Sequence, residues 1–254
     1  MSWSSHIWKH GASSTYTRLR KNKFIKSSKN GYGFCDVIFG WDSNDELYEL
    51  NVKQEELYTG WHSGFPDAKA SIVPNSGRIN PYEEEVPFFL AEFEADGDHP
   101  ICPRTRLRKI LEELSEAGFS VLSGFEYEFF IFKETSQSIR EKQYMNLEPL
   151  SPGNFGYSLL RTMTFSDLFD EFMDYCRDHN FELEGLHCET GPGVWEAAIS
   201  ADTVLEAADK AALFKTFTKA FFQRKNMTAT FMAKWSMDYP GQSGHLHQSL
   251  LSLE

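Results

Sequence analysis

The spacing of apolar and polar residues changes near Pro103 and predicts two kinds of structure along the chain. Before that point, runs rich in aromatic and β-branched residues, such as Tyr32–Trp41, are separated by prolines and glycines, a pattern typical of short strands and loops. After it, apolar residues recur at helical spacing and predict a helix from Pro103 to about Gly118, with an apolar side formed by Leu107, Ile110, Leu111 and Leu114. We therefore expect a β-rich first region and a mixed second region.

Strand patterns return several times in the second region. Phe119–Phe132 is rich in Phe, Val and Ile and alternates with polar residues, which predicts a strand. Further strands are expected at Phe181–Glu189, Val194–Ser200, Thr228–Trp235 and His245–Leu250.

Two more helices are predicted between these strands. The capping-box pattern Thr164–Asp167 predicts the start of a helix that buries Leu168, Phe169, Phe172, Met173 and Cys176. A longer helix is predicted from Thr203 to about Lys225, with an apolar side of Leu205, Ala208, Ala212, Phe217 and Phe221. Helices with one apolar side beside several strands indicate an α+β fold in which the helices cover one face of a sheet.

Length and composition support a globular protein. A chain of 254 residues fits one large or two modest domains, and we place their limits at residues 1–100 and 101–254. Hydrophobic residues make up 41% of the chain, without an apolar stretch long enough for a membrane span. The formal net charge of −12 disfavours binding to nucleic acid, so neither nucleic acid nor membrane is an expected partner.

The charge is unevenly distributed. Met1–Cys35 contains seven Lys or Arg residues and no acidic residue, which leaves 18 basic against 37 acidic side chains from Asp36 to Glu254. We interpret the basic start as a surface strand, with an organelle transit peptide as the alternative. The four cysteines are scattered without a Cys-x-x-Cys pair, which favours a reducing compartment and a cytoplasmic location.

Polar residues interrupt three of the predicted strands as pairs. Glu126 and Glu128 are two residues apart and share a strand face, as do His245 and His247. A Gly-Pro-Gly reversal at residues 191–193 brings Glu189 and Glu196 to nearly facing positions. Each pair alone has an ordinary explanation: a solvated sheet face, an exposed hairpin, or a chance His-x-His spacing.

Together, the three pairs predict a binuclear metal site on one sheet. Carboxylates with one or two imidazoles suit Mg²⁺ or Mn²⁺, and two such ions would offset the repulsion between the carboxylates. Sites of this kind serve phosphoryl transfer from ATP. A single iron centre formed by His245, His247 and one Glu is the alternative, but it leaves the pair Glu126 and Glu128 unexplained.

Four motifs in the same order resemble those of the glutamine synthetase superfamily. Gly124–Phe130 resembles its first metal motif, and His187–Glu196 resembles its His-His-Glu and Gly-Gln-x-Glu segment. Thr230–Lys234 is similar to its Thr-Phe-Met-Pro-Lys motif, and Gly241–Leu250 is similar to its His-x-His segment. The resemblance implies an N-terminal β-grasp-like domain, followed by a glutamine synthetase catalytic domain whose curved antiparallel sheet is covered by helices.

The resemblance also implies a role for individual residues. By position, one metal ion would be held by Glu128, Glu189 and Glu196, and a second by Glu126 and His245. Glu184, His247 and Ser249 match ATP-contacting positions, and Gly241 matches a backbone contact to glutamate. Asp42 and Asp45 are the candidates for the residue that assists deprotonation of ammonia. The implied reaction joins glutamate to ammonia or an amine through γ-glutamyl phosphate, with ATP as co-substrate.

The sequence departs from the family pattern in two ways. Cys188 replaces the second His and Val194 replaces the usual Gln, which indicates an acceptor other than ammonia as an alternative. Family catalytic domains continue far beyond the His-x-His strand and supply there a sixth metal ligand and phosphate-binding arginines, whereas this chain ends at Glu254. We therefore expect this partial chain alone to be inactive, with a lengsin-like structural relative, a fragment or a splice form as the alternative to an active ligase.

The resemblance implies a homo-oligomer as well, since family members form rings. We expect the apolar residues of Tyr32–Trp41 and of Gly60–His62 to face a partner, the alternative being that they pack inward.

Overall fold

The computed structural model describes residues 4–9, 15–35, 38, 62–80, 82, 86–95, 97–98 and 102–253. The chain divides into two compact units, one of residues 1–119 with 253–254 and one of residues 120–252, which we describe separately. Among the described residues, no helix has the length and apolar character needed to cross a membrane.

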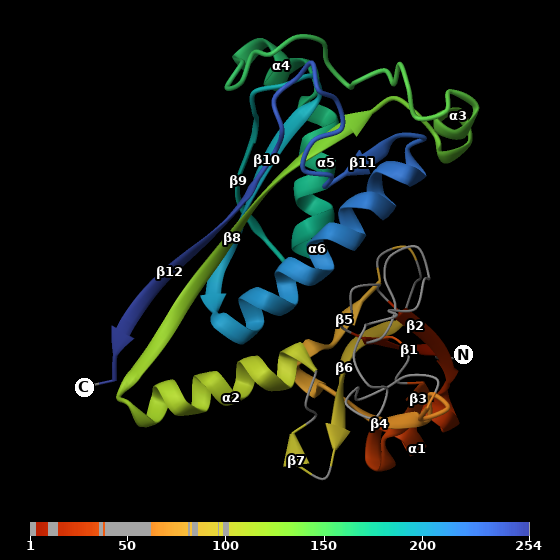
Figure 1. Cartoon of the computed structure of the whole chain (residues 1–254), viewed down its shortest axis with the longest axis vertical. Helices are drawn as coiled ribbons and strands as arrows, with labels where there is room; N and C mark the ends of the chain where they lie inside the picture. The colour runs from red at the N-terminus through yellow and green to blue at the C-terminus, as the bar shows by residue number, and fades with distance from the viewer. Residues whose placement is uncertain are drawn as a thin grey trace. The chain divides into compact units, whose positions relative to one another are not determined.

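The first unit contains a mixed sheet of short strands (Figure 1). Its strands are β1 (Ser4–Lys9), β2 (Thr15–Arg20), β3 (Tyr32–Cys35), β4 (Asp67–Ile72), β5 (Arg78–Ile79), β6 (Pro87–Ala95) and β7 (Gly97–Asp98), with helices α1 (Lys21–Asn30) and α2 (Pro103–Glu116) and the 3-10 turn η3 (Pro74–Ser76). The strand order is β2-β1-β6-β4-β3, and β1 runs parallel to β6. A small core fills this unit with Leu19, Ile38, Ala70, Ala91, Phe93 and Cys102.

The expected β-rich character of the first region is confirmed, and so is the helix at Pro103. The strand expected at Tyr32–Trp41 is observed at Tyr32–Cys35; beyond it only Ile38 is described, and it is buried in the core. The interpretation of the basic start as strand alone was wrong, because α1 follows β2 directly. Only Phe24 and Ser27 turn inward from this helix, too few apolar positions to produce a helical pattern in the sequence.

The second unit is a five-stranded sheet with its two long helices on one side (Figure 1). Its strands are β8 (Phe119–Phe132), β9 (Leu183–Cys188), β10 (Val194–Thr203), β11 (Thr228–Thr230) and β12 (Gly244–Ser252), and its helices are α3 (Ser136–Glu141), α4 (Leu159–Thr164), α5 (Ser166–Asp178) and α6 (Val204–Arg224). The strand order is β11-β8-β10-β9, with β12 on β8. β10 is antiparallel to both of its neighbours.

An aromatic core separates this sheet from α5 and α6. Phe129 of β8 is fully buried, with its ring centroid 6.1 Å from that of Phe172 in α5 and 6.2 Å from that of Phe214 in α6. On the adjacent strand, the Trp195 ring stacks on Phe169 of α5 at 3.5 Å. Odd-numbered positions of β8 thus face the helices, and even-numbered positions such as Glu126 and Glu128 face away, as the strand pattern predicts.

The predicted elements of the second unit are confirmed with local corrections. The strand expected at Thr228–Trp235 is observed only at Thr228–Thr230. Thr164 ends α4 and donates to the Leu160 carbonyl, so the predicted capping box does not form, and α5 begins at Ser166 without a side-chain cap. In α6 the buried face includes Ala207, Ala211, Leu213, Phe214 and Phe222 beside the predicted Phe221. The predicted apolar side was therefore rotated, because a nearly continuous apolar helix offers several plausible faces.

Truncation of the aromatic core should destabilise the second unit strongly. We expect Phe129→Ala to lower the free energy of unfolding by about 3–5 kcal/mol, because it removes a ring buried against α5 and α6 and leaves a cavity. Leu160→Ala is the matched control: its side chain is 77% exposed, and we expect a change of no more than about 0.5 kcal/mol. Urea unfolding of both variants measures the difference, and equal midpoints would contradict this account of the core.

A buried carboxylate anchors the end of β8. The Glu134 side chain is 3% exposed and accepts hydrogen bonds from the Ser138 hydroxyl at 2.6 Å and the Glu148 amide at 2.9 Å, and it forms an ion pair with Lys142. The Lys142 ammonium and the Ser138 hydroxyl lower the pKa of Glu134 to about 2, against the resistance of burial. The ionised carboxylate therefore stabilises the fold.

The stabilisation by Glu134 should disappear in acid. Since its pKa is lower in the folded chain than the ordinary 4.5, its contribution is complete above pH 4.5 and is lost as the pH falls towards 2. Glu134→Gln should therefore be less stable than the parent at pH 7, with a difference that shrinks steadily below pH 4.5. Urea midpoints at a series of pH values test this, and a difference independent of pH would contradict it.

Candidate metal centre

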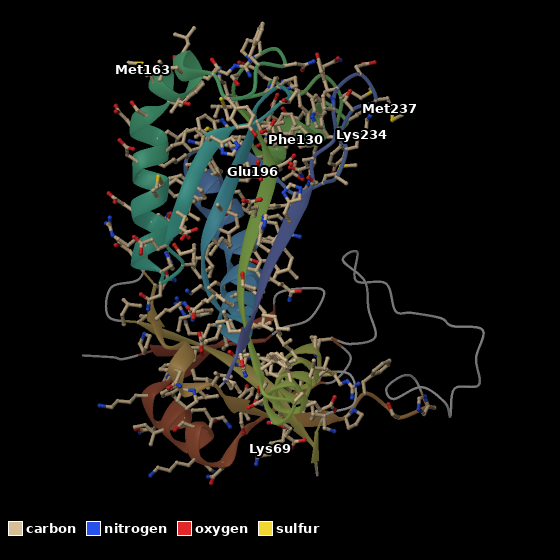
Figure 2. The ribbon with its side chains drawn as sticks, turned by 90° about the vertical axis from the view of Figure 1, so that its left-hand side faces the viewer. Lys69, Phe130, Met163, Glu196, Lys234 and Met237 are labelled. Carbon is tan, nitrogen blue, oxygen red and sulfur yellow. The ribbon has the colours of Figure 1, made fainter. Side chains whose placement is uncertain are left out.

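Three neighbouring strands bring carboxylates and an imidazole into one row on the sheet face that lies opposite the helices. The register places Glu196 of β10 directly across from Glu128 of β8, and His187 of β9 directly across from Glu196. Glu196 lies part-way along the sheet in Figure 2 and is 8% exposed. The predicted facing partner of Glu196 was Glu189; the observed one is His187, with Glu189 just beyond the end of β9.

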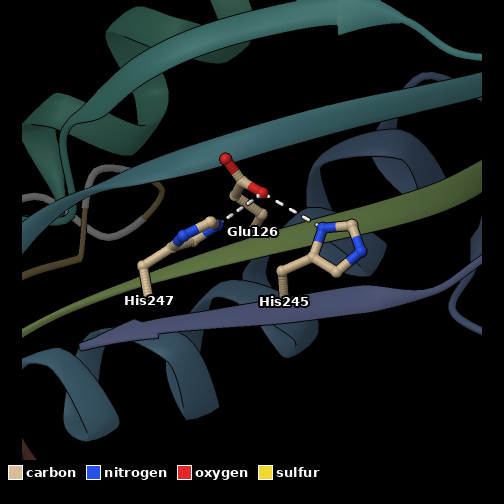
Figure 3. Close-up of side chains that lie close together, drawn as sticks. All are labelled: Glu126, His245 and His247. Carbon is tan, nitrogen blue, oxygen red and sulfur yellow. Dashed lines mark hydrogen bonds and ion pairs between the residues drawn. The ribbon is translucent and has the colours of Figure 1, made fainter.

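The first group of potential ligands joins β8 and β12. Glu126 Oε2 lies 3.1 Å from His245 Nδ1 and 3.0 Å from His247 Nε2, so both imidazoles converge on one carboxylate oxygen (Figure 3). His245 Nδ1 also lies 3.7 Å from Glu196 Oε1. The predicted pairing of Glu126 with His245 on one side of the site is thus present in the geometry, and His247 joins them.

The second group lies at the β9–β10 hairpin. His187 Nε2 lies 3.4 Å from Glu189 Oε2 and 3.3 Å from Glu196 Oε2. The Tyr157 ring stacks on the His187 imidazole at 4.7 Å, and its hydroxyl bonds to Glu189. Glu128 belongs to neither group: its carboxylate accepts hydrogen bonds from the Ser243 amide at 3.1 Å and the Ser243 hydroxyl at 2.8 Å.

A tight turn fixes the hairpin that carries these groups. Gly193 has φ +69°, and a Cβ there would lie 2.5 Å from the Ile131 carbonyl oxygen. The Ile131 amide in turn donates to the Gly193 carbonyl at 2.8 Å. The turn between Glu189 and Glu196 is therefore joined backbone to backbone with β8, which only glycine permits at this distance.

The electrostatics differ between neighbouring carboxylates. The His247 imidazole, helped by His245, lowers the pKa of Glu126. Burial opposes ionisation of Glu189, but hydrogen bonds from Thr190 and Tyr157 outweigh it and lower its pKa. Burial raises the pKa of Glu196. The nearby carboxylates raise this pKa further, whereas His187 opposes the rise. A nearby cation would oppose this rise, because it favours the ionised form of Glu196.

A cavity of about 200 Å³ opens beside the first group. Glu184, His247 and Ser249, the residues expected to contact ATP, all line it together with Glu126 and Leu122. Gly241 lies away from this cavity, in a bend where a Cβ would come within 2.7 Å of the Ala233 carbonyl oxygen. Asp42 and Asp45 lie outside the described residues.

Two residues of the centre were missed as ligand or contact candidates in the sequence. His187 precedes Glu189 by two positions on one strand, which is the same-face signal that identified the other pairs. Tyr157 left no such signal, because it reaches the site from a loop, with φ +54° and its amide donating to the Cys188 carbonyl at 2.7 Å.

The residues present fit divalent cations. The ligand atoms of each group, Glu126 with both His245 and His247, and His187 with Glu189 and Glu196, lie within 4.8 Å of one another. His187 Nε2 is buried and makes no hydrogen bond with any described residue, although it points at two carboxylates. A nitrogen lone pair and carboxylate oxygens converging in this way suit Mn²⁺ or Mg²⁺.

A family model described as "Glutamine synthetase, catalytic domain" matches residues 100–254. The chain belongs to the glutamine synthetase family. Curated relatives in this family include type-1 glutamine synthetase 2 of Dictyostelium discoideum, 45% identical over 238 residues, and glutamate–isopropylamine ligase of Pseudomonas sp, 33% identical over 232 residues. These alignments cover 93% and 90% of this chain, but 44% and 49% of the relatives.

Two solved structures share the fold. Apo GmaS superposes with a TM-score of 0.77 at 20% identity, over 98% of this chain and 54% of that one. The glutamine synthetase of Plasmodium falciparum gives a TM-score of 0.72 at 19% identity, over 98% and 51%. The chain therefore has the α+β fold of the glutamine synthetase family and spans about half the length of the relatives it matches.

Removal of one ligand from either group should weaken metal binding. We expect Glu126→Gln and Glu196→Gln to bind Mn²⁺ at least about tenfold more weakly than the parent, since even outer-shell losses cost about 10–100-fold. Parent binding should weaken as the pH falls, because metal-binding imidazoles and carboxylates must be deprotonated and the raised pKa of Glu196 adds to this competition by protons.

Titration calorimetry measures both effects. Glu148→Gln is the matched control, because the Glu148 side chain is 62% exposed and belongs to neither group. Unchanged Mn²⁺ affinity in both site variants would contradict the assignment.

Proposed function

We propose that this chain carries the metal- and ATP-binding part of an ATP-dependent ligase that joins the γ-carboxylate of glutamate to ammonia or an amine. The observation that carries the proposal is the convergence of two carboxylate–imidazole groups beside a cavity lined by Glu184, His247 and Ser249. The family membership supports the ligase class, and the names of the relatives include both ammonia- and amine-using enzymes.

The proposed reaction has two steps, a phosphoryl transfer and an amide-bond formation. An oxygen of the glutamate γ-carboxylate attacks the γ-phosphorus of ATP, the bond to the β,γ-bridging oxygen breaks, and ADP leaves. The nitrogen of the acceptor then attacks the γ-carbonyl carbon, phosphate leaves, and the nitrogen gives up a proton. Catalysis of such transfers depends mainly on position and on neutralised charge.

The described residues can meet both requirements. Glu126, His245 and His247 would hold one divalent cation, His187, Glu189 and Glu196 a second, and Glu128 would add a carboxylate between them. Bound there, the cations would neutralise the charge of the phosphate oxygens. Ser249 and Glu184 offer polar groups to the nucleotide, and Leu122 offers it apolar surface. Gly241 keeps its proposed role as a backbone contact to glutamate, and Asp42 or Asp45 as the residue that assists ammonia deprotonation.

The remaining expectations extend this proposal to the whole protein. We assign the sheet of the first unit to a β-grasp-like domain and propose domain limits at residues 1–100 and 101–254, with α2 at the start of the second domain. We also propose a cytoplasmic homo-oligomer. We expected an exposed apolar surface on Tyr32–Trp41. Two described residues of this segment do not contribute to one, because Ile38 is 2% exposed and Phe34 packs on the same core. His62 is exposed, and Trp41, Gly60 and Trp61 lie outside the described residues.

Nucleotide binding tests the proposal most directly. We expect the 254-residue chain to bind ATP only with Mn²⁺ or Mg²⁺. His247→Ala and Ser249→Ala should each weaken ATP binding by about tenfold, because each removes a polar group from the cavity.

Phosphate release that requires glutamate together with ammonia, isopropylamine or putrescine measures ligase activity. Because about half of the relatives' length is not represented, we expect no turnover from this chain alone. ATP binding that needs no metal and survives both substitutions would contradict the proposal, whereas binding without turnover in the complete protein would favour the inactive relative.

A further inference from the structure

Ser243 lies directly before β12 and contacts residues on both strands of the first group. Its carbonyl accepts a hydrogen bond from the Glu128 amide at 3.1 Å, and its own amide donates to Glu128 Oε2 at 3.1 Å. Its hydroxyl lies 2.8 Å from Glu128 Oε1 and 3.3 Å from His245 Nε2. Ser243 thus bonds to the backbone and both carboxylate oxygens of Glu128, and it also reaches one imidazole of the first group.

The direction of these hydrogen bonds follows from the chemistry of the partners. A serine hydroxyl donates one proton and accepts through its oxygen lone pairs, whereas a carboxylate only accepts. The hydroxyl proton of Ser243 therefore points to Glu128 Oε1, and the lone pairs are left for His245 Nε2. A neutral imidazole can bond to these lone pairs only if Nε2 carries the ring proton. His245 Nδ1 then keeps its own lone pair free.

The Nδ1 atom of the same ring faces carboxylates. It lies 3.1 Å from Glu126 Oε2 (Figure 3) and 3.7 Å from Glu196 Oε1. A lone pair beside carboxylate oxygens needs a cation or a further ring proton between them. Imidazoles that bind metal ions almost always donate their second N–H to an outer partner, which fixes the ring and its tautomer. The Ser243 hydroxyl stands where that partner of His245 would be.

Ser243 also links the two groups of potential ligands. Its hydroxyl contacts His245 of the first group, and the carboxylate that it holds, Glu128, lies across the β8–β10 ladder from Glu196 of the second group. Removal of this one hydroxyl would therefore release a side chain on each side of the centre.

We propose that Ser243 is a positioning residue of the metal centre. Its hydroxyl selects Nδ1 as the nitrogen through which His245 meets a cation, and its hydroxyl and amide together hold Glu128 beside Glu196. The inference rests on the proposed function, since it requires that the centre holds divalent cations. Ser243 acts through its neighbours, because Glu128 and His245 occupy its hydroxyl.

Mn²⁺ titration of Ser243 variants tests the inference. Ser243→Ala removes the hydroxyl and should weaken Mn²⁺ binding about tenfold or more, as the loss of outer partners generally does. Ser243→Thr keeps a hydroxyl at an exposed position and should bind Mn²⁺ like the parent. In a Glu128→Ala chain, the change Ser243→Ala should weaken binding less than it does in the parent, because one of the two side chains that the hydroxyl holds is already gone.

Nitrogen NMR of the metal-free chain, labelled at histidine, gives a second readout that a general loss of stability would not reproduce. At alkaline pH the imidazoles are neutral, and the two tautomers of His245 can be distinguished. The fraction of His245 with its proton on Nε2 should be larger in the parent and in Ser243→Thr than in Ser243→Ala, because only a hydroxyl offers Nε2–H an acceptor there. The signal that His245→Gln removes identifies the residue.

Ser166→Ala is the matched control. The Ser166 hydroxyl is exposed and donates to the Met163 carbonyl at 3.2 Å, away from every residue of the centre, so this variant should bind Mn²⁺ like the parent. Circular dichroism should show that all variants are folded. Parent Mn²⁺ affinity and parent tautomer fractions in Ser243→Ala would overturn the inference and leave the ligase proposal intact. A parent chain that binds no Mn²⁺ would overturn both.

Discussion

Like-charged carboxylates held side by side on one face of the second sheet impose the constraint on which the rest of that unit depends. Glu196 lies across the β8–β10 ladder from Glu128, and Glu126 and Glu189 extend the same acidic surface. Groups of one sign at this distance repel each other unless hydrogen bonds, imidazoles or cations intervene. The Ser243 hydroxyl and the imidazole of His187 supply only part of that compensation. The remaining repulsion between the carboxylates destabilises the folded chain. A bound cation would relieve this repulsion, which favours cation binding.

The opposite face of the same strands resists that repulsion. Alternation along β8 and β10 places Phe129 and Trp195, which are next in sequence to Glu128 and Glu196, on the face that packs against α5 and α6. Burial of these rings stabilises the strands by far more than a surface ion pair could, so the acidic row is held in register without its cations. The alternation of side chains along β8 and β10 thus places the aromatic core on one face of the sheet and the carboxylates of the site on the other.

The sequence predicted features whose physical cause is local. The strand Phe119–Phe132 and the faces of Glu126 and Glu128 follow from period two, and the length of α6 follows from its uninterrupted helical pattern. It failed where the cause is non-local. Helix α1 has too few apolar positions to be seen, and Tyr157 reaches the site only because a loop bonds to the Cys188 backbone. His187 was predictable from its spacing to Glu189, since the two side chains share a strand face.

The contact between Gly193 and the Ile131 carbonyl has a consequence for reading variants of this chain. Gly193 touches no ligand and belongs to no core cluster, yet any side chain there must push the hairpin away from β8. Such a displacement would separate Glu196 from Glu128. It would also break the hydrogen bond from the Ile131 amide to the Gly193 carbonyl. A substitution at this glycine would thus have the effect of losing a metal ligand, although every ligand residue is unchanged in the sequence.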